Sequence, residues 1–219
     1  RLHRWLALAV GMMLPVWFAT GMVLSFQPFP ILGQGAKWAA AEPLRLAPGT
    51  AFQPFSRTSS AAELRRIRLV SIDGTDRFLI QQSDGHTRAF DARTGRALAP
   101  IDAALAGRIA AAFAGLAVRA VEGPIEQDRW TVHDKYLLHR PLFRVRLADD
   151  AGTVLYLSAA TGEVLQRTTA RQRGWNQVGA LLHWLNLGNL RAHFEAWHFT
   201  IRSVATLALV LTLSGITIG

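Results

Sequence analysis

Apolar residues gather at the two ends of the chain, and alternating patterns occupy the middle. The first run, Leu2 to Phe26, reads LHRWLALAVGMMLPVWFATGMVLSF and carries no charge after Arg4. A bilayer core about 30 Å thick needs roughly 20 apolar residues of helix, and this run supplies them. We therefore predict a transmembrane helix over residues 1–28, with Pro15 kinking the helix rather than breaking it.

A second run without charge extends from Ser203 to Gly219 and predicts another transmembrane helix over residues 196–219. The sequence starts without Met, and this run continues to the last residue. We expect the chain to be a piece of a longer protein that could hold more membrane helices after Gly219. Arg1 and Arg4 flank the first span, so the positive-inside rule places the N-terminus in the cytoplasm and the middle of the chain outside it.

The middle of the chain begins with a connector rich in Gly, Pro and Ala, expected over residues 29–57. Ser60 and Glu63 then fit a capping box, which predicts a short helix to about Ile67. From Phe78 the pattern alternates, and the Asp-Gly pair at 84–85 predicts a hairpin whose second strand covers 87–90.

A second helix and a second sheet follow. Asp102 predicts the N-cap of a helix that ends near Leu116. Further strands are predicted at 143–147, 154–157 and 163–165. An aromatic and aliphatic segment over 171–195 predicts a helix at the outer membrane interface, before the chain enters the second span.

Four residues recur at an offset of 67. The pairs are Gly85 and Gly152, Thr94 and Thr161, Gly95 and Gly162, and Leu98 and Leu165. Coincident offsets indicate an internal duplication, which we place at 58–100 and 101–170. Each copy is predicted to be a helix followed by a small antiparallel sheet.

Two stretches resemble a known family. FRVRLADDAGTVLYLSAATGEVL, within the second copy, resembles the PepSY domain, in which two strands are followed by Asp-x-x-Thr-Gly-Glu-Val; Ser158 replaces the usual Asp, whereas the first copy has Asp91. Leu2-His3-Arg4-Trp5 with the later Thr20-Gly21 resembles the opening of PepSY-associated transmembrane proteins, and Ser214-Gly215 resembles an echo of that Thr-Gly.

Pattern and resemblance together predict an α+β membrane protein of the bacterial inner membrane. Two transmembrane helices would flank a periplasmic domain built from two PepSY-like repeats. We interpret Thr20-Gly21 and Ser214-Gly215 as close helix contacts, because small residues let membrane helices approach each other.

The composition of the chain excludes several kinds of partner and binding site. The chain has 24 Lys and Arg against 15 Asp and Glu, a net charge of +9, but the basic residues are scattered rather than gathered into a patch with aromatic residues. We therefore expect no nucleic-acid partner. With no cysteine, the chain cannot form disulfides, thiolate zinc sites or cysteine-ligated iron–sulfur clusters.

Four histidines near the spans are candidate axial ligands of a haem iron, the only metal site that we expect. They are His3, His183, His193 and His198. A haem near the outer face could use two of the last three, and we prefer His183 with His198. His193 and His198 would point about 140° apart on one helix, unless the helix begins between them. A haem near the inner face would need His3 and a partner from outside this sequence. His3 could equally hydrogen-bond a headgroup or a backbone carbonyl.

The resembled family includes inner-membrane reductases of ferric siderophores that carry b-type haem between their helices. The resemblance therefore implies haem b and electron transfer to a periplasmic acceptor such as a ferric chelate. The alternative is a non-catalytic, membrane-anchored PepSY module. It would bind a partner protein, either as an accessory or assembly subunit of a membrane complex or as a protease inhibitor.

Overall fold

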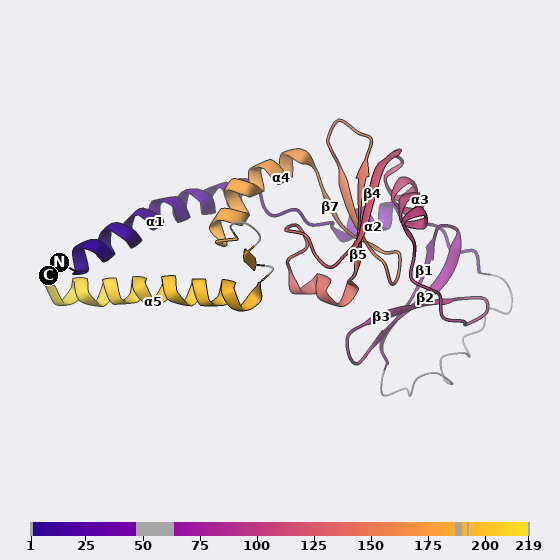
Figure 1. The fold of residues 1–219 in the computed structure, drawn as a ribbon. Helices are drawn as coiled ribbons and strands as arrows, with labels where there is room; N and C mark the ends of the chain where they lie inside the picture. Colours follow the sequence, from indigo (N-terminus) through magenta and orange to yellow (C-terminus); the bar gives the residue numbers. More distant parts are fainter. Residues whose placement is uncertain (1, 47–63, 187–189, 192, 219) are drawn as a thin grey trace. The chain divides into compact units, whose positions relative to one another are not determined.

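Two structural units make up the α+β fold of the computed structural model (Figure 1). The structure describes residues 2–46, 64–186, 190–191 and 193–218. The helical unit comprises Arg1–Pro30 and Arg171–Gly219, and the sheet unit comprises Ile31–Ala170.

Two long helices form most of the helical unit. α1 (Leu2–Phe26) and α5 (Phe194–Ile218) lie side by side and antiparallel, so both chain ends are at the same end of the pair (Figure 1). Each helix is long and apolar enough to cross a membrane, and α1 continues through Pro15. The most apolar window of α5 has no buried residue, whereas the core helix of a soluble protein would be mostly buried.

A shorter helical segment packs against α1. It consists of α4 (Ala170–Asn176) and a π-helical turn, Gln177–Leu181. A Cβ atom added to Gly179 would lie 3.1 Å from Cγ1 of Val23, so the glycine permits this close approach. The predicted helical spacing fails at Leu185, whose φ of 52° lies outside the helical range.

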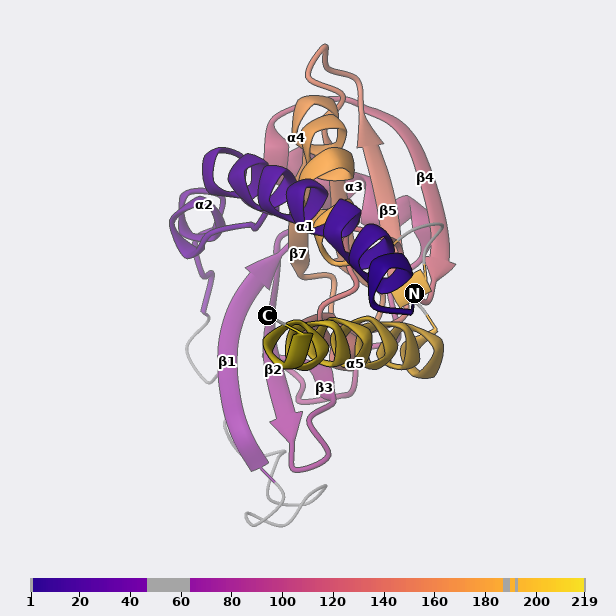
Figure 2. The ribbon, with the colours of Figure 1, turned by 90° about the vertical axis from the view of Figure 1, so that its left-hand side faces the viewer.

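In the part of the sheet unit that the structure describes there are two antiparallel sheets and two α-helices. The first sheet has the order β1-β2-β3 and the second has the order β4-β5-β6-β7. Their strands are β1 (Leu64–Ile72), β2 (Thr75–Gln82), β3 (Thr87–Asp91), β4 (Val118–Ile125), β5 (Leu142–Leu147), β6 (Val154–Ser158) and β7 (Val164–Thr168). The helices are α2 (Gln34–Ala39) and α3 (Ala103–Ala114). Figure 2 shows β1 and β2 as long paired strands.

The helix predicted to end near Ile67 is wrong where the structure describes it, because residues 64–67 belong to β1. Ser60 and Glu63 lie outside the described residues. β1 pairs with β2 across a two-residue turn in which Asp73 and Gly74 have φ values of 52° and 69°. An Asp-Gly pair between apolar strands is a strong hairpin signal, and it identifies β1 where the capping-box pattern did not.

Two other local predictions are confirmed. Asp102 caps α3, since its Oδ1 accepts a hydrogen bond of 2.7 Å from the backbone N–H of Leu105. Such a cap contributes about 1 kcal/mol. The hairpin around Gly85 also forms, with β2 and β3 paired in register. β4 was not predicted, because Gly123 and Pro124 made its sequence resemble a loop.

The offset of 67 residues recurs in the backbone. β3 and β6 have the same length and start 67 residues apart, as do the starts of β2 and β5. In the turns that follow, Gly95 N–H donates to the Asp91 carbonyl and Gly162 N–H to the Ser158 carbonyl, each at 2.8 Å. Among the described residues, α3 precedes the second sheet and α2 precedes the first, and α2 lies outside the predicted range 58–100.

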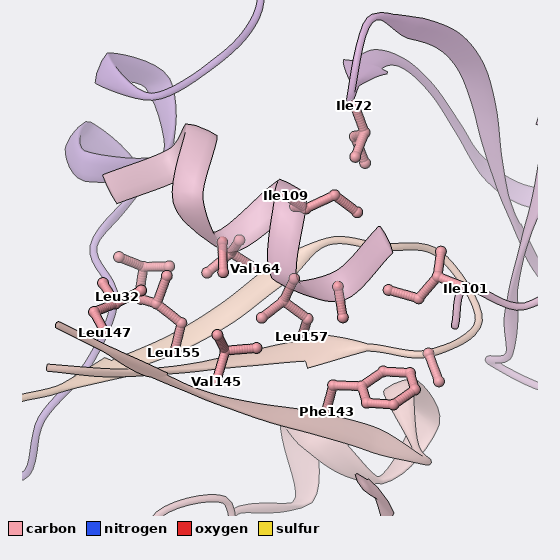
Figure 3. Packing of buried hydrophobic residues seen from close by; sticks show 13 residues of the cluster. Leu32, Ile72, Ile101, Ile109, Phe143, Val145, Leu147, Leu155, Leu157 and Val164 are labelled. Atoms are coloured by element: carbon pink, nitrogen blue, oxygen red, sulfur yellow. The ribbon is translucent and has the colours of Figure 1, made fainter. Parts of the chain in front are cut away.

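The largest core of the sheet unit lies between α3 and the four-stranded sheet (Figure 3). Val145, Leu155 and Leu157 rise from the strands toward α3, whereas Ile109 projects from the helix toward Ile72. Ile72 at the end of β1 belongs to this core. The first sheet is therefore joined to the second by apolar packing.

Arg77 completes that junction with polar contacts. The residue is only 5% exposed, and its guanidinium donates to the carbonyl oxygens of Ile72 at 2.9 Å and Thr161 at 3.3 Å. Gly162 has a φ of 80°, and a Cβ atom there would lie 3.1 Å from Cδ1 of Ile109. The β6–β7 turn thus lies close to α3 as well as to β2.

Replacing Arg77 with Met should destabilise the protein by about 2–4 kcal/mol, because two buried carbonyl oxygens lose their donor. A urea titration of the detergent-purified chain, followed by circular dichroism, measures the free energy of unfolding. The control is Arg88→Met, at an exposed position of β3. This substitution should change stability by less than about 0.5 kcal/mol. Equal stability of the two variants would contradict the role of Arg77.

A 3-10 helix, Asp134–His139, carries a buried tyrosine, Tyr136, and a half-buried histidine, His139. Burial raises the pKa of Tyr136 to about 12. Burial also lowers the pKa of His139 below its usual 6.5; Arg68 and Lys37 add to this effect, and Glu163 opposes it. His139 therefore stays neutral to a lower pH in the folded protein than in the unfolded chain.

The lowered pKa of His139 predicts a dependence of stability on pH. Below about pH 6.5 the unfolded chain binds a proton at this residue more readily than the folded chain. Stability should therefore fall as the pH decreases from 6.5, until the folded His139 also becomes protonated. Urea titrations at pH 7.5 and 5.5 should show a smaller loss for His139→Leu than for the unmodified chain. The exposed His86→Leu variant should keep the full loss, and an unchanged loss in His139→Leu would refute the prediction.

Candidate functional site

The helical unit encloses an apolar cavity of about 730 Å³. Its walls come from α1, α5 and the segment 182–185. The lining residues are Val10, Met12, Met13, Leu14, Val16, Trp17, Thr20, Leu182, His183, Leu185, Ile201, Val204, Ala205 and Ala208. This size is typical of sites for small molecules and cofactors, which combine apolar walls with a few placed polar groups.

Among the described residues that line the cavity, only His183 has an ionisable side chain. Its Nδ1 lies 3.2 Å from the Trp17 carbonyl oxygen and 3.2 Å from Oγ1 of Thr20. The Trp17 indole stacks on the imidazole with ring centroids 5.2 Å apart, and Nε1 of Trp17 donates to the His183 carbonyl at 3.2 Å. The ring of His183 is therefore held in one orientation.

These contacts also identify the tautomer of His183. The Trp17 carbonyl oxygen can only accept, and the Thr20 hydroxyl already donates to that same oxygen at 2.9 Å. Both neighbours therefore need Nδ1 of His183 to carry the proton. In the neutral imidazole Nε2 then keeps its lone pair, and a ring nitrogen in this state can bind a metal while the backbone carbonyl fixes the other nitrogen.

His3 has a similar environment at the other end of α1. Its Nδ1 lies 2.8 Å from Oγ of Ser214, whose hydroxyl donates to the Leu211 carbonyl. A Cβ atom on Gly215 would lie 3.6 Å from Cε1 of His3. His3 does not line the cavity.

The two hydroxyl–glycine pairs therefore contact histidine rings. Thr20 and Gly21 face His183, and Ser214 and Gly215 face His3. We predicted close contacts between helices at these pairs. Ser214-Gly215 makes such a contact between α5 and α1, through His3. Thr20-Gly21 instead contacts the segment that follows the π-helical turn.

His193 and His198 lie outside the cavity wall. α5 begins between them, at Phe194, as a shared ligand would require. His198 packs against Phe194 and Trp197, with ring centroids 4.1 Å and 5.1 Å away, and His193 is exposed. Among the described residues no contact joins His183 to His198, so the structure places only one of the four predicted ligands in the cavity wall.

Sequence reasoning missed a cluster near the start of α5. The guanidinium of Arg191 lies 5.1 Å from the ring centroid of Trp184 and 4.9 Å from that of Trp197. Nε1 of Trp197 donates to the Trp184 carbonyl at 2.8 Å. Cation–π contacts of this kind stabilise a partly desolvated charge. The excess of tryptophan near both spans was the signal available in the sequence.

The donor set limits the kind of metal centre that the cavity could hold. In the part of the chain that the structure describes, no group of three or more His, Asp or Glu side chains could hold a metal ion. A single oriented imidazole in an apolar wall fits a cofactor that brings its own equatorial ligands, as haem does. No protein-family model, curated protein or solved structure matches this chain.

Replacing Gly21 with Leu should displace the His183 ring, because even a Cβ atom there would lie 3.1 Å from Cε1 of His183. We expect a loss of about 1–3 kcal/mol, the usual effect of overpacking, seen as a lower thermal midpoint in detergent. Gly11 is the matched control on the same helix, since a Cβ atom there meets nothing within 4 Å. If Gly11→Leu and Gly21→Leu melted alike, the packing of Gly21 on His183 would be disproved.

Proposed function

We propose that this chain is a PepSY-associated protein of the bacterial inner membrane that carries a b-type haem in the cavity of its helical unit. Its activity would be electron transfer to a periplasmic acceptor such as a ferric chelate. The observation that carries this proposal is His183, whose Nδ1 contacts Trp17 and Thr20 at the wall of an apolar cavity.

The membrane part of the proposal rests on α1 and α5. Their apolar surfaces are largely exposed: Trp5, Phe18 and Phe26 on α1 and Phe199 and Ile216 on α5 are each more than 70% exposed. Lipid would cover such surfaces at no hydrophobic cost. With Arg4 at the cytoplasmic end of α1, the sheet unit would lie in the periplasm.

Haem would supply the redox chemistry, and the chain would bind and tune it. His183 would provide one axial nitrogen, and the Trp17 carbonyl would raise the basicity of that imidazole through its hydrogen bond to Nδ1. The aliphatic wall formed by Val204, Ala205 and Ala208 would exclude water from the cofactor. Burial and hydrogen bonding of this kind set the potential at which an electron is accepted.

The sheet unit would receive the acceptor. The PepSY resemblance of residues 143–165 supports this assignment, as does the equivalence of the turns at Gly95 and Gly162. The competing hypothesis, a PepSY module that only binds a partner protein, has no use for an oriented imidazole in an apolar cavity.

A reduced-minus-oxidised absorption spectrum of the detergent-purified chain tests the proposal. We expect a b-type haem signal that falls at least tenfold in His183→Ala, because the imidazole is lost while the cavity remains. His193→Ala is the control and should keep the signal, since His193 is exposed and outside the cavity wall. Added imidazole should restore haem binding to His183→Gly.

Two further variants identify a second ligand. His198→Ala and His3→Ala should show which of these side chains, if either, also changes the spectrum. A folded chain without any haem signal, checked by its circular dichroism melt, would refute the proposal. Co-purification would then be the route to a partner protein, as the competing hypothesis requires.

A further inference from the structure

A second cavity, of about 680 Å³, lies wholly within the sheet unit. Its walls come from residues 34–42, which include α2, from β1 and α3, and from residues 162–164, where the second sheet turns into β7. Aromatic surface is provided by Trp38, which is 77% exposed, and by Phe113. The cavity is unrelated to the proposed haem site, which belongs to the helical unit.

The wall of this cavity carries more positive than negative charge. Its cations are Lys37, Arg66 and Arg68, and its carboxylates are Glu42 and Glu163. Arg68 and Glu163 neutralise each other through two hydrogen bonds, of 2.5 Å and 3.0 Å.

The other wall charges are not matched in this way. Glu42 accepts the backbone N–H groups of Asp73 and Gly74, at 2.8 Å and 2.7 Å. Among the described residues, neither Lys37 nor Arg66 forms an ion pair. Burial lowers the pKa of Lys37 despite the nearby Glu163, so an added anion would stabilise its charged form.

We propose that this cavity binds a small organic anion, with its carboxylate or phosphate near Lys37 and Arg66, and its apolar body against Trp38 and Phe113. The two cations recognise the anionic group, and the aromatic rings bury the body of the ligand. Glu163 does not oppose binding, since Arg68 already neutralises it.

Calorimetric titration of the full chain in detergent tests this site with 2-naphthoate as the probe. The neutral 2-naphthamide has the same ring system, and a titration into empty micelles gives the background. We expect naphthoate to bind at least tenfold more tightly than naphthamide. Lys37→Gln and Arg66→Gln should each weaken naphthoate binding about tenfold.

Arg65→Gln is the matched control. It removes the same charge one residue away on β1, outside the cavity wall, and should leave the affinity unchanged. Equal binding of naphthoate and naphthamide would overturn the proposal. So would an equal loss in Arg65→Gln and Arg66→Gln, because the effect would then come from the general charge of β1. No outcome of this titration depends on haem. The anion site can therefore be refuted without refuting the proposed haem site, and the reverse also holds.

Discussion

The buried guanidinium of Arg77 is the interaction on which the sheet unit depends. Removing such a charge from water is costly unless every polar neighbour is satisfied. Arg77 meets this condition in part: its two terminal nitrogens donate to backbone carbonyls, one from its own sheet and one from the β6–β7 turn, whereas its Nε has no partner among the described residues. Arg144 stands 67 residues later and is partly exposed, and it pairs instead with the carboxylates of Glu122 and Asp128. Equivalent positions thus use different partners because their burial differs.

The helical unit follows a different constraint. Its long helices satisfy their own backbone groups, as a membrane requires. Several hydroxyl side chains return their hydrogen bonds to carbonyls four residues earlier, including those of Ser25, Thr200, Thr206 and Thr212. Thr20 and Ser214 differ, because each hydroxyl also meets a histidine ring. These two hydroxyls therefore connect their own helix to a histidine of another segment.

Local physics explains which parts of the fold could be predicted. The N-cap at Asp102, the hairpin at Gly85 and the two apolar helices each depend on residues close in sequence. The start of β1 was assigned to a helix because of a capping-box pattern, and the Asp-Gly pair at 73–74 was not used. β4 was missed because Gly123 and Pro124 interrupt its alternation, and only its pairing with β5 makes it a strand.

The sequence by itself determined the positions of the long apolar helices, the strands next to strong turns and the shortlist of four histidines. Only the tertiary structure decided that His183 lines a cavity and that its Nδ1 contacts Thr20 and the Trp17 carbonyl. The partner residue Thr20 is 163 positions away in the chain. No local pattern reports such a contact, because burial and hydrogen-bond partners arise when distant segments pack together. For the same reason, the environments of Lys37 and Arg66 became visible only in the folded chain.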